Sequence, residues 1–190
     1  MNEMHPLNLA TLSGRVILTG ISGGERCLSA VAGSLTAHSS GEPVLLDMSG
    51  IEALGGSALR HLLQGIQSLE TCHGSAIVLA NLSEDNLAEA DLVADATRSP
   101  YISARLTGEA LTHPEVRGPL DEKVAKALRL VLQAGEADAL AVSQLSNESG
   151  VVTAWNNRLV SLHSLGLLRQ RKVGKRKLYS PVIGGLAYGS

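Results

Sequence analysis

The stretch TAWNNRLVSLHSLGLLRQRKVGKRKLYSPV, residues 153–182, decides the fold of the C-terminal part of this chain. Apolar side chains recur in it at helical spacing, which predicts a helix with one buried face: Trp155, Leu159, Leu162 and Leu165. Thr153 is expected to cap this helix and Gly166 to end it. Two strands are predicted after the helix, over 167–172 and 177–182. The turn between them is Val173-Gly174-Lys175-Arg176.

Two further helices are predicted upstream of this stretch. Asp121 can cap the first, whose apolar residues continue at helical spacing until Gly135. The second covers about 139–147, and a short turn separates it from the helix that follows. This turn is Glu148-Ser149-Gly150. Residues 121–190 are therefore predicted to form three helices and a β-hairpin, which is the arrangement of a winged helix-turn-helix domain.

Three segments of this predicted domain resemble the winged-helix regulators of bacteria. Residues 145–151, LSNESGV, resemble the turn between the two helices of the helix-turn-helix. Residues 157–169, NRLVSLHSLGLLR, are similar to the recognition helix, the Leu-Gly-Leu elbow and the first strand of the wing. Residues 176–180, RKLYS, are similar to the returning strand. The resemblance implies a domain that binds duplex DNA.

The charge of the chain supports a polyanion as the partner of this domain. The whole chain has a net charge of -2, but the two halves differ in sign. Up to Leu120 there are 6 basic residues, all Arg, and 13 acidic ones, whereas from Asp121 there are 10 basic and 5 acidic residues. Between Val151 and Pro181 there are seven basic residues and no acidic one. Such a segment favours binding to nucleic acid, and a solvated basic face is the alternative.

The winged-helix interpretation divides the candidate DNA-binding residues into two sets. The third helix would enter the major groove by its N-terminal turns, where asparagine can bond adenine and arginine can bond guanine. The candidates for these base contacts are Thr153, Asn156, Asn157 and Arg158. The basic residues of the hairpin are expected to lie along phosphates. They are Arg169, Arg171, Lys172, Lys175, Arg176 and Lys177.

The N-terminal part of the chain, residues 1–116, is predicted to be a separate α/β domain. Short aliphatic runs, typical of strands, alternate in it with longer helical stretches. The predicted strands centre on residues 16–18, 44–46, 76–79 and 101–102. The predicted helices cover about 25–39, 57–69 and 86–97, so one sheet covered by helices is expected. The segment around Pro114, Gly118 and Pro119 lacks apolar periodicity and is taken as the boundary between the domains.

Residues 43–59, PVLLDMSGIEALGGSAL, resemble the STAS domain of anti-sigma factor antagonists. In that family a similar strand is followed by an Asp-Ser-Ser-Gly-Leu loop whose second serine is phosphorylated by a partner kinase. The resemblance implies that Ser57 occupies the phosphoacceptor position, although Gly55, Gly56 and Ala58 depart from the family's pattern. From the residues alone, Ser57 is expected to be a helix cap.

Other residue patterns argue against catalysis and against a cofactor. The glycine-rich segment 19–24, TGISGG, lacks the Gly-Lys-Ser/Thr of a P-loop and is predicted to be a turn. The six histidines show no metal-ligand spacing, so no metal site is expected. Cys27 and Cys72 are expected to be reduced in a cytoplasmic protein. No signal peptide and no membrane-spanning run is found.

The sequence thus leads to a hypothesis of function with two alternatives. We expect a non-enzymatic, cytoplasmic transcriptional regulator whose winged helix binds double-stranded DNA. Its STAS-like domain would sense a signal, bind a regulatory protein or form a homodimer, since regulators commonly pair two DNA-binding domains. One alternative is a non-catalytic adaptor in a kinase or sigma-control assembly, with the winged helix as an assembly surface. The other is a DNA-binding component of a mobile element or defence system.

Overall fold

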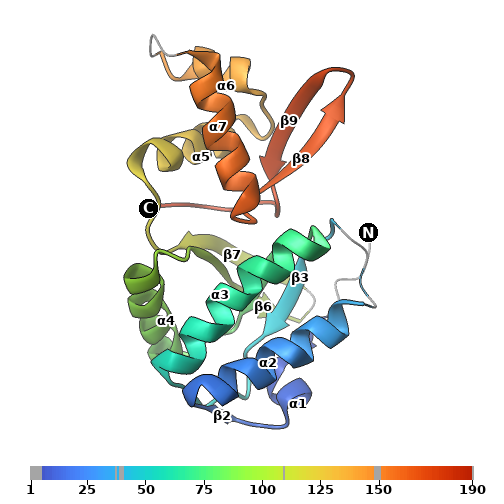
Figure 1. Cartoon of the computed structure of the whole chain (residues 1–190), viewed down its shortest axis with the longest axis vertical. Helices are drawn as coiled ribbons and strands as arrows, with labels where there is room; N and C mark the ends of the chain where they lie inside the picture. The colour runs from blue at the N-terminus through green and yellow to red at the C-terminus, as the bar shows by residue number, and fades with distance from the viewer. Residues whose placement is uncertain (1–5, 37, 39–40, 109, 148–150, 190) are drawn as a thin grey trace.

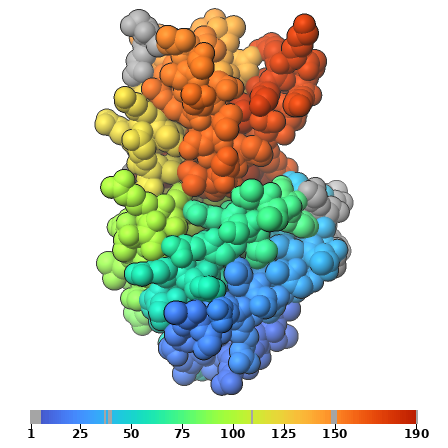
Figure 2. Space-filling view, viewed as in Figure 1, coloured from blue at the N-terminus to red at the C-terminus, as the bar shows by residue number. Residues whose placement is uncertain are grey.

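The computed structural model describes residues 6–36, 38, 41–108, 110–147 and 151–189. The chain forms an N-terminal α/β part, up to Arg117, and a C-terminal part of helices and a hairpin, from Glu122. The two parts are stacked along the long axis of the molecule (Figure 1). Figure 2 shows the C-terminal part, yellow to red, seated directly on the N-terminal part. The predicted fold class, an α/β sheet followed by three helices and a hairpin, is confirmed.

The N-terminal part is built on a sheet of five strands in the order β1-β3-β5-β6-β7. Neighbouring strands are parallel except for β7, which runs antiparallel to β6. The strands are β1 (Leu7–Asn8), β3 (Val44–Asp47), β5 (Ile77–Ala80), β6 (Tyr101–Thr107) and β7 (Ala110–Arg117). Two short strands, β2 (Ile17–Leu18) and β4 (Ala53–Leu54), pair with each other in parallel outside this sheet.

Helices cover one face of the sheet because alternate strand residues point to it. They are α1 (Leu9–Ser13), α2 (Gly20–Leu35), α3 (Gly56–His73) and α4 (Glu84–Thr97). Leu46 of β3 and Leu79 of β5 join the apolar core beneath these helices. The predicted helical face of α3 is confirmed, since Leu59, Leu62 and Ile66 are buried.

The opposite face of the sheet is covered by the C-terminal part. Leu45, adjacent to Leu46 in β3, belongs to a second apolar cluster. This cluster also contains Val182 and Ile183, which follow the hairpin. The chain end adds backbone pairing, since Ala187 accepts from the Val116 N–H and donates to the Pro114 carbonyl, both at 2.9 Å. The two parts are therefore joined by a common apolar cluster and by main-chain hydrogen bonds.

The C-terminal part contains α5 (Glu122–Ala134), α6 (Ala139–Leu145), α7 (Val152–Ser164), β8 (Leu168–Val173) and β9 (Arg176–Pro181). Asp121 caps α5 as predicted, accepting from the Lys123 N–H at 3.0 Å, and Gly135 follows its last residue. On α7, Trp155, Leu159 and Leu162 are buried as predicted. The predicted turn at 148–150 lies outside the described residues.

The prediction of a turn at residues 19–24 is wrong, because these residues form the beginning of α2. The glycines serve close packing between helices instead. A Cβ atom on Gly24 would lie 2.7 Å from the Ala58 carbonyl oxygen and 2.7 Å from the Cβ of His61. Only glycine lets α2 and α3 approach this closely.

Another local prediction is wrong. Thr153 does not cap α7, since Val151 occupies the cap position and Thr153 lies inside the first turn. The backbone of Ala154 donates to the Val151 carbonyl at 2.8 Å, so the helix begins earlier than its polar residues indicate.

Residues 113–117, at the start of the segment taken as the domain boundary, belong to β7, where His113 has a positive φ of 52°. The pairing partners of β7 supply the order that its own sequence lacks.

Candidate nucleic-acid interface

Helix α7 has one buried face and one exposed face. Trp155 and Leu159 are buried against the other helices, while Thr153 and Asn157 are exposed. Asn156 is half-buried. The guanidinium of Arg158 lies 4.2 Å from the centre of the Trp155 ring, which is a cation–π contact. Of the predicted base-contacting set, Thr153 and Asn157 are thus the most accessible.

The β8–β9 hairpin projects beside α7 (Figure 1). Directly opposed residues of an antiparallel pair share one face, and successive residues alternate between faces. Lys172 is opposed to Lys177, and Gln170 to Tyr179. Because Tyr179 is buried with its ring edge against His163 of α7, this face is the one turned toward α7. Lys172 and Lys177 therefore extend from the side of the hairpin that faces the helix.

Arg171 and Arg176 lie on the other face of the hairpin and hold acidic partners. Arg171 pairs with Glu136 through two contacts, Nε to Oε1 at 2.6 Å and Nη2 to Oε2 at 2.5 Å. Arg176 pairs with Asp138 at 2.6 Å and 2.7 Å. Glu136 and Asp138 were not recognised as functional residues from the sequence. Their signal is the alternation Glu-Ala-Asp just before α6, which places both carboxylates on one face of an extended segment.

Asp138 joins the hairpin to the start of α6. Its Oδ1 caps α6 by accepting from the Ala141 N–H at 2.9 Å, and its Oδ2 accepts from Arg176. The Ala141 hydrogen bond, together with Arg176, holds the pKa of Asp138 below its usual value in spite of burial. Between these two acids, the backbone of Ala137 exchanges two hydrogen bonds of 2.9 Å with Tyr179. The base of the hairpin is thereby fixed to the helices.

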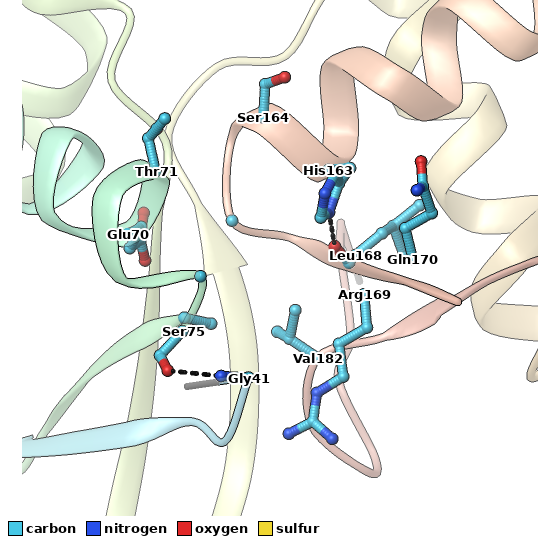
Figure 3. A pocket seen from close by; sticks show the side chains of 13 residues that line it. Gly41, Glu70, Thr71, Ser75, His163, Ser164, Leu168, Arg169, Gln170 and Val182 are labelled. Carbon is cyan, nitrogen blue, oxygen red and sulfur yellow. Dashed lines mark hydrogen bonds between the residues drawn. The ribbon is translucent and has the colours of Figure 1, made fainter. Parts of the chain in front are cut away.

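Most of the positive side chains of the hairpin that lack an acidic partner in the described chain are lysines. Within the ranges that the structure describes, Lys172, Lys175 and Lys177 have no acidic partner. All three are exposed, and Lys175 lies in the turn beside Gly174, whose φ is 61°. Arg169, the remaining member of the predicted phosphate-contacting set, lies near the base of the hairpin instead. It lines a cavity between the two parts of the chain (Figure 3).

Ser57 lies in the first turn of α3 and is exposed. The expectation that it caps this helix is wrong, because Gly55 occupies the cap position and makes no side-chain hydrogen bond. The two glycines lie where neighbouring chain comes close: a Cβ on Gly56 would be 2.7 Å from the Glu89 carboxylate. The close approach of Glu89 to Gly56 cannot be predicted from the local sequence, because Glu89 is distant in the chain. The hydroxyl of Ser57 is left accessible to solvent.

The loop before Ser57 is held by Asp47, at the carboxyl end of β3. Its carboxylate accepts from the Ser49 hydroxyl at 2.6 Å, the Asn81 amide at 2.9 Å and the Asn8 amide at 3.1 Å. Burial acts to raise the pKa of Asp47, but these hydrogen bonds outweigh it and lower the pKa. The cluster satisfies itself internally, which indicates a structural role for the Asp-Met-Ser-Gly segment.

The described residues contain no cluster that could hold a metal ion and no helix that could span a membrane. Within these residues, no group of three His, Cys, Asp or Glu side chains is placed to hold a metal ion. In the same part of the chain, no helix combines the length and the apolarity needed to cross a bilayer.

No family model matches the chain, and no curated protein matches it significantly. Function is therefore inferred from the geometry of α7 and the hairpin.

Proposed function

We propose that this protein is a cytoplasmic, DNA-binding transcriptional regulator whose residues 121–190 act as a winged helix. Helix α7 enters the major groove and the hairpin lies along a phosphate backbone. The observation that carries this proposal is the set of exposed lysines without acidic partners on the hairpin beside α7: Lys172, Lys175 and Lys177. Such charges attract phosphates and release counterions from DNA.

The proposal gives α7 the role of reading bases. Asn157 and Thr153 are exposed, and asparagine and threonine side chains can hydrogen-bond base edges. Arg158 is already stacked on Trp155 and can reach a base only by leaving that ring. Arg171 and Arg176 similarly hold Glu136 and Asp138, so their contribution to phosphate binding is smaller than that of the lysines.

The N-terminal part, in this proposal, is a STAS-like domain that regulates DNA binding and forms a homodimer. Dimer formation pairs two α7 helices on a two-fold symmetric site. Exposed apolar side chains cluster in sequence near β2 and the start of α2: Val16, Ile17 and Ile21 are 45%, 54% and 61% exposed. They support a contact with a second copy or a regulatory protein. Light scattering at micromolar concentration tests the dimer, and a monomer mass with and without DNA would refute it.

The DNA-binding proposal is tested with the full chain and random-sequence duplex DNA at several salt concentrations. The variant Lys172→Gln/Lys177→Gln removes two charges from the face turned toward α7. The control Lys123→Gln removes a charge from the exposed side of α5. We expect the double variant to weaken binding on every sequence and the control to bind as the original protein does. Equal affinity of the double variant and the original protein would refute the proposal.

One observation favours a protein-binding adaptor as the second candidate. Apolar side chains are exposed on α6 and at the start of α7, where Leu140, Leu145 and Val151 are 51%, 49% and 73% exposed. Exposed apolar side chains near one another are more typical of a protein interface than of a phosphate contact. An adaptor would show no steep loss of DNA affinity with salt, so the same titration separates the two functions.

A further inference from the structure

A cavity of about 300 Å³ lies between the two parts of the chain (Figure 3). One wall is the C-terminal end of α3 with the segment that follows it, and the other is the end of α7 with β8. Short side chains and glycines leave the space open. The walls carry Glu70 and Ser75 on the N-terminal side and His163, Arg169 and Gln170 on the C-terminal side. Its volume is at the lower end of the range for small-molecule sites.

Glu70 presents a partly unsatisfied carboxyl group at this seam. Its Oε1 accepts from the Ile77 N–H at 2.8 Å, whereas Oε2 has no hydrogen bond within the described part of the chain. Oε2 lies against the elbow that follows α7, because a Cβ on Gly166 would be only 2.6 Å from it. Burial raises the pKa of Glu70 to about 8, with the Ile77 hydrogen bond acting in the opposite direction.

Arg169 carries a positive charge on the other wall of the cavity. Its side chain runs past Val182 (Figure 3). Unlike Arg171 and Arg176, it has no acidic partner among the residues that the structure describes. Glu70 and Arg169 also form no ion pair with each other in this set of residues. The cavity thus offers one acid and one base, each without an ionic partner in the described chain.

A third polar group near this cavity lacks a hydrogen-bond partner in the described chain. The amide nitrogen Nε2 of Gln67 is buried with no hydrogen-bond partner, the only such side-chain atom among the described residues. Gln67 lines a hollow that adjoins the cavity, since both are lined by Thr71 and Ser164. A buried donor without an acceptor costs about 1–3 kcal/mol, so an acceptor from a ligand is favoured there.

We propose that this cavity binds a free α-amino acid, whose carboxylate pairs with Arg169 and whose ammonium group pairs with Glu70. Arginine binds carboxylates through two parallel hydrogen bonds. A simple anion would leave Glu70 without a partner, and a simple cation would leave Arg169 without one. A zwitterion satisfies both walls at once, and a cavity of about 300 Å³ has room for a free amino acid.

Regulation follows from the position of the cavity, and this step alone rests on the proposed function. Leu167 and Leu168 join the elbow to the apolar cluster that contains residues of α7, and Glu70 contacts this elbow at Gly166. A ligand that pairs with Glu70 therefore changes a contact that places α7 on the N-terminal part. Amino-acid binding then changes the affinity for DNA. The binding step itself is independent of any DNA contact.

The binding step is tested by calorimetry of the full chain without DNA, with each standard L-amino acid at millimolar concentration. The titrations are made at neutral pH in two buffers of different ionisation enthalpy. We expect one or a few amino acids to bind with release of a proton, because the ammonium group stabilises the ionised form of Glu70. Other titratable groups near the cavity include His163 on α7, Cys72 in the adjoining hollow, Glu42 next to Gly41, and His73, whose ring nitrogen lies 2.9 Å from the Ser75 hydroxyl.

Two variants test whether Glu70 and Arg169 are the side chains that bind the amino acid. Glu70→Gln should remove the proton release and weaken binding about tenfold or more, and Arg169→Gln should weaken it similarly. The matched controls Glu25→Gln and Arg105→Gln, both exposed and away from the cavity, should bind as the original protein does. Melting curves establish that each variant is folded. If Glu70→Gln is not folded, Arg169→Gln still decides, because Arg169 is exposed.

The absence of binding by every amino acid would overturn the proposal, as would binding that neither variant weakens. Proton release that persists in Glu70→Gln would assign it to another of these titratable groups and overturn the role of Glu70. Amino-acid binding without any DNA binding would refute the proposed function and leave this site standing.

Discussion

Lys172 of β8 lies directly opposite Lys177 of β9, so two positive side chains are neighbours on one face of the hairpin. Like charges in this position destabilise a sheet. Nothing in the described chain neutralises them, whereas the nearby arginines are paired with acids. A pair that costs stability in the free protein is explained if a polyanion neutralises it in the complex.

This pair predicts opposite changes in stability and in DNA binding. Lys172→Gln/Lys177→Gln should raise the free energy of unfolding by roughly 0.2–0.5 kcal/mol, since the charges are exposed and screened. The same variant should weaken binding to all DNA sequences alike. Urea unfolding and a binding titration measure the two effects. A loss of stability would show that the lysines support the hairpin and would contradict this explanation.

Asn157 is predicted to read a base. Asn157→Ala should cost about 1–3 kcal/mol of binding free energy on sites with a particular base and little on others. The free energy of unfolding of this variant should change little because the Asn157 side chain is exposed. Selection from a random duplex library, with the original protein and the variant, gives the comparison. An equal loss on every sequence would remove Asn157 from the base-contacting set.

Two serines near helix starts differ in role: Ser83 caps its helix, whereas the hydroxyl of Ser57 is accessible. Ser83 caps α4 by accepting from the Asn86 N–H at 3.2 Å, so Ser83→Ala should cost about 1 kcal/mol of stability. Ser57 has no such bond, so Ser57→Ala should be within about 0.5 kcal/mol of the original protein. Ser57→Asp should gain roughly 0.3–1 kcal/mol from the helix dipole. Chemical denaturation tests all three, and a costly Ser57→Ala would restore the capping role.

Glu70 predicts how stability depends on pH. Its pKa is raised from 4.5 to about 8, so the folded protein binds more protons than the unfolded chain between these values. Its contribution to stability is therefore lost as pH rises through this window. Glu70→Gln should remove that loss, so its advantage over the original protein should grow with pH. Unfolding curves at several pH values test this, and a constant difference would contradict the raised pKa.

The parts of the fold that depend on local patterns could be predicted from the sequence. The spacing of Trp155, Leu159 and Leu162 predicted the buried face of α7, and Asp121 predicted the start of α5. A cap and a periodic face involve residues within a few turns of one another. Gly174 and its neighbours predicted the hairpin turn for the same reason.

The rest depends on contacts between distant segments. Strand β7 is ordered by β6 on one side and by Ala187 on the other, and neither partner can be read from its own sequence. Gly24 packs against Ala58, which turned an expected loop into a helix. In the candidate site, the basic residues were identified, but not which of them pair with acids, because the partners of Arg171 and Arg176 are distant in the chain.

The most direct test of the account is the dependence of DNA affinity on salt, measured with the full chain. The isolated C-terminal part is unsuitable, because Val182 and Ile183 belong to an apolar cluster shared with the sheet. We predict that log affinity for random duplex falls linearly as log salt rises, and that Lys172→Gln/Lys177→Gln makes the slope shallower by about 2. A slope near zero for the original protein would contradict the account.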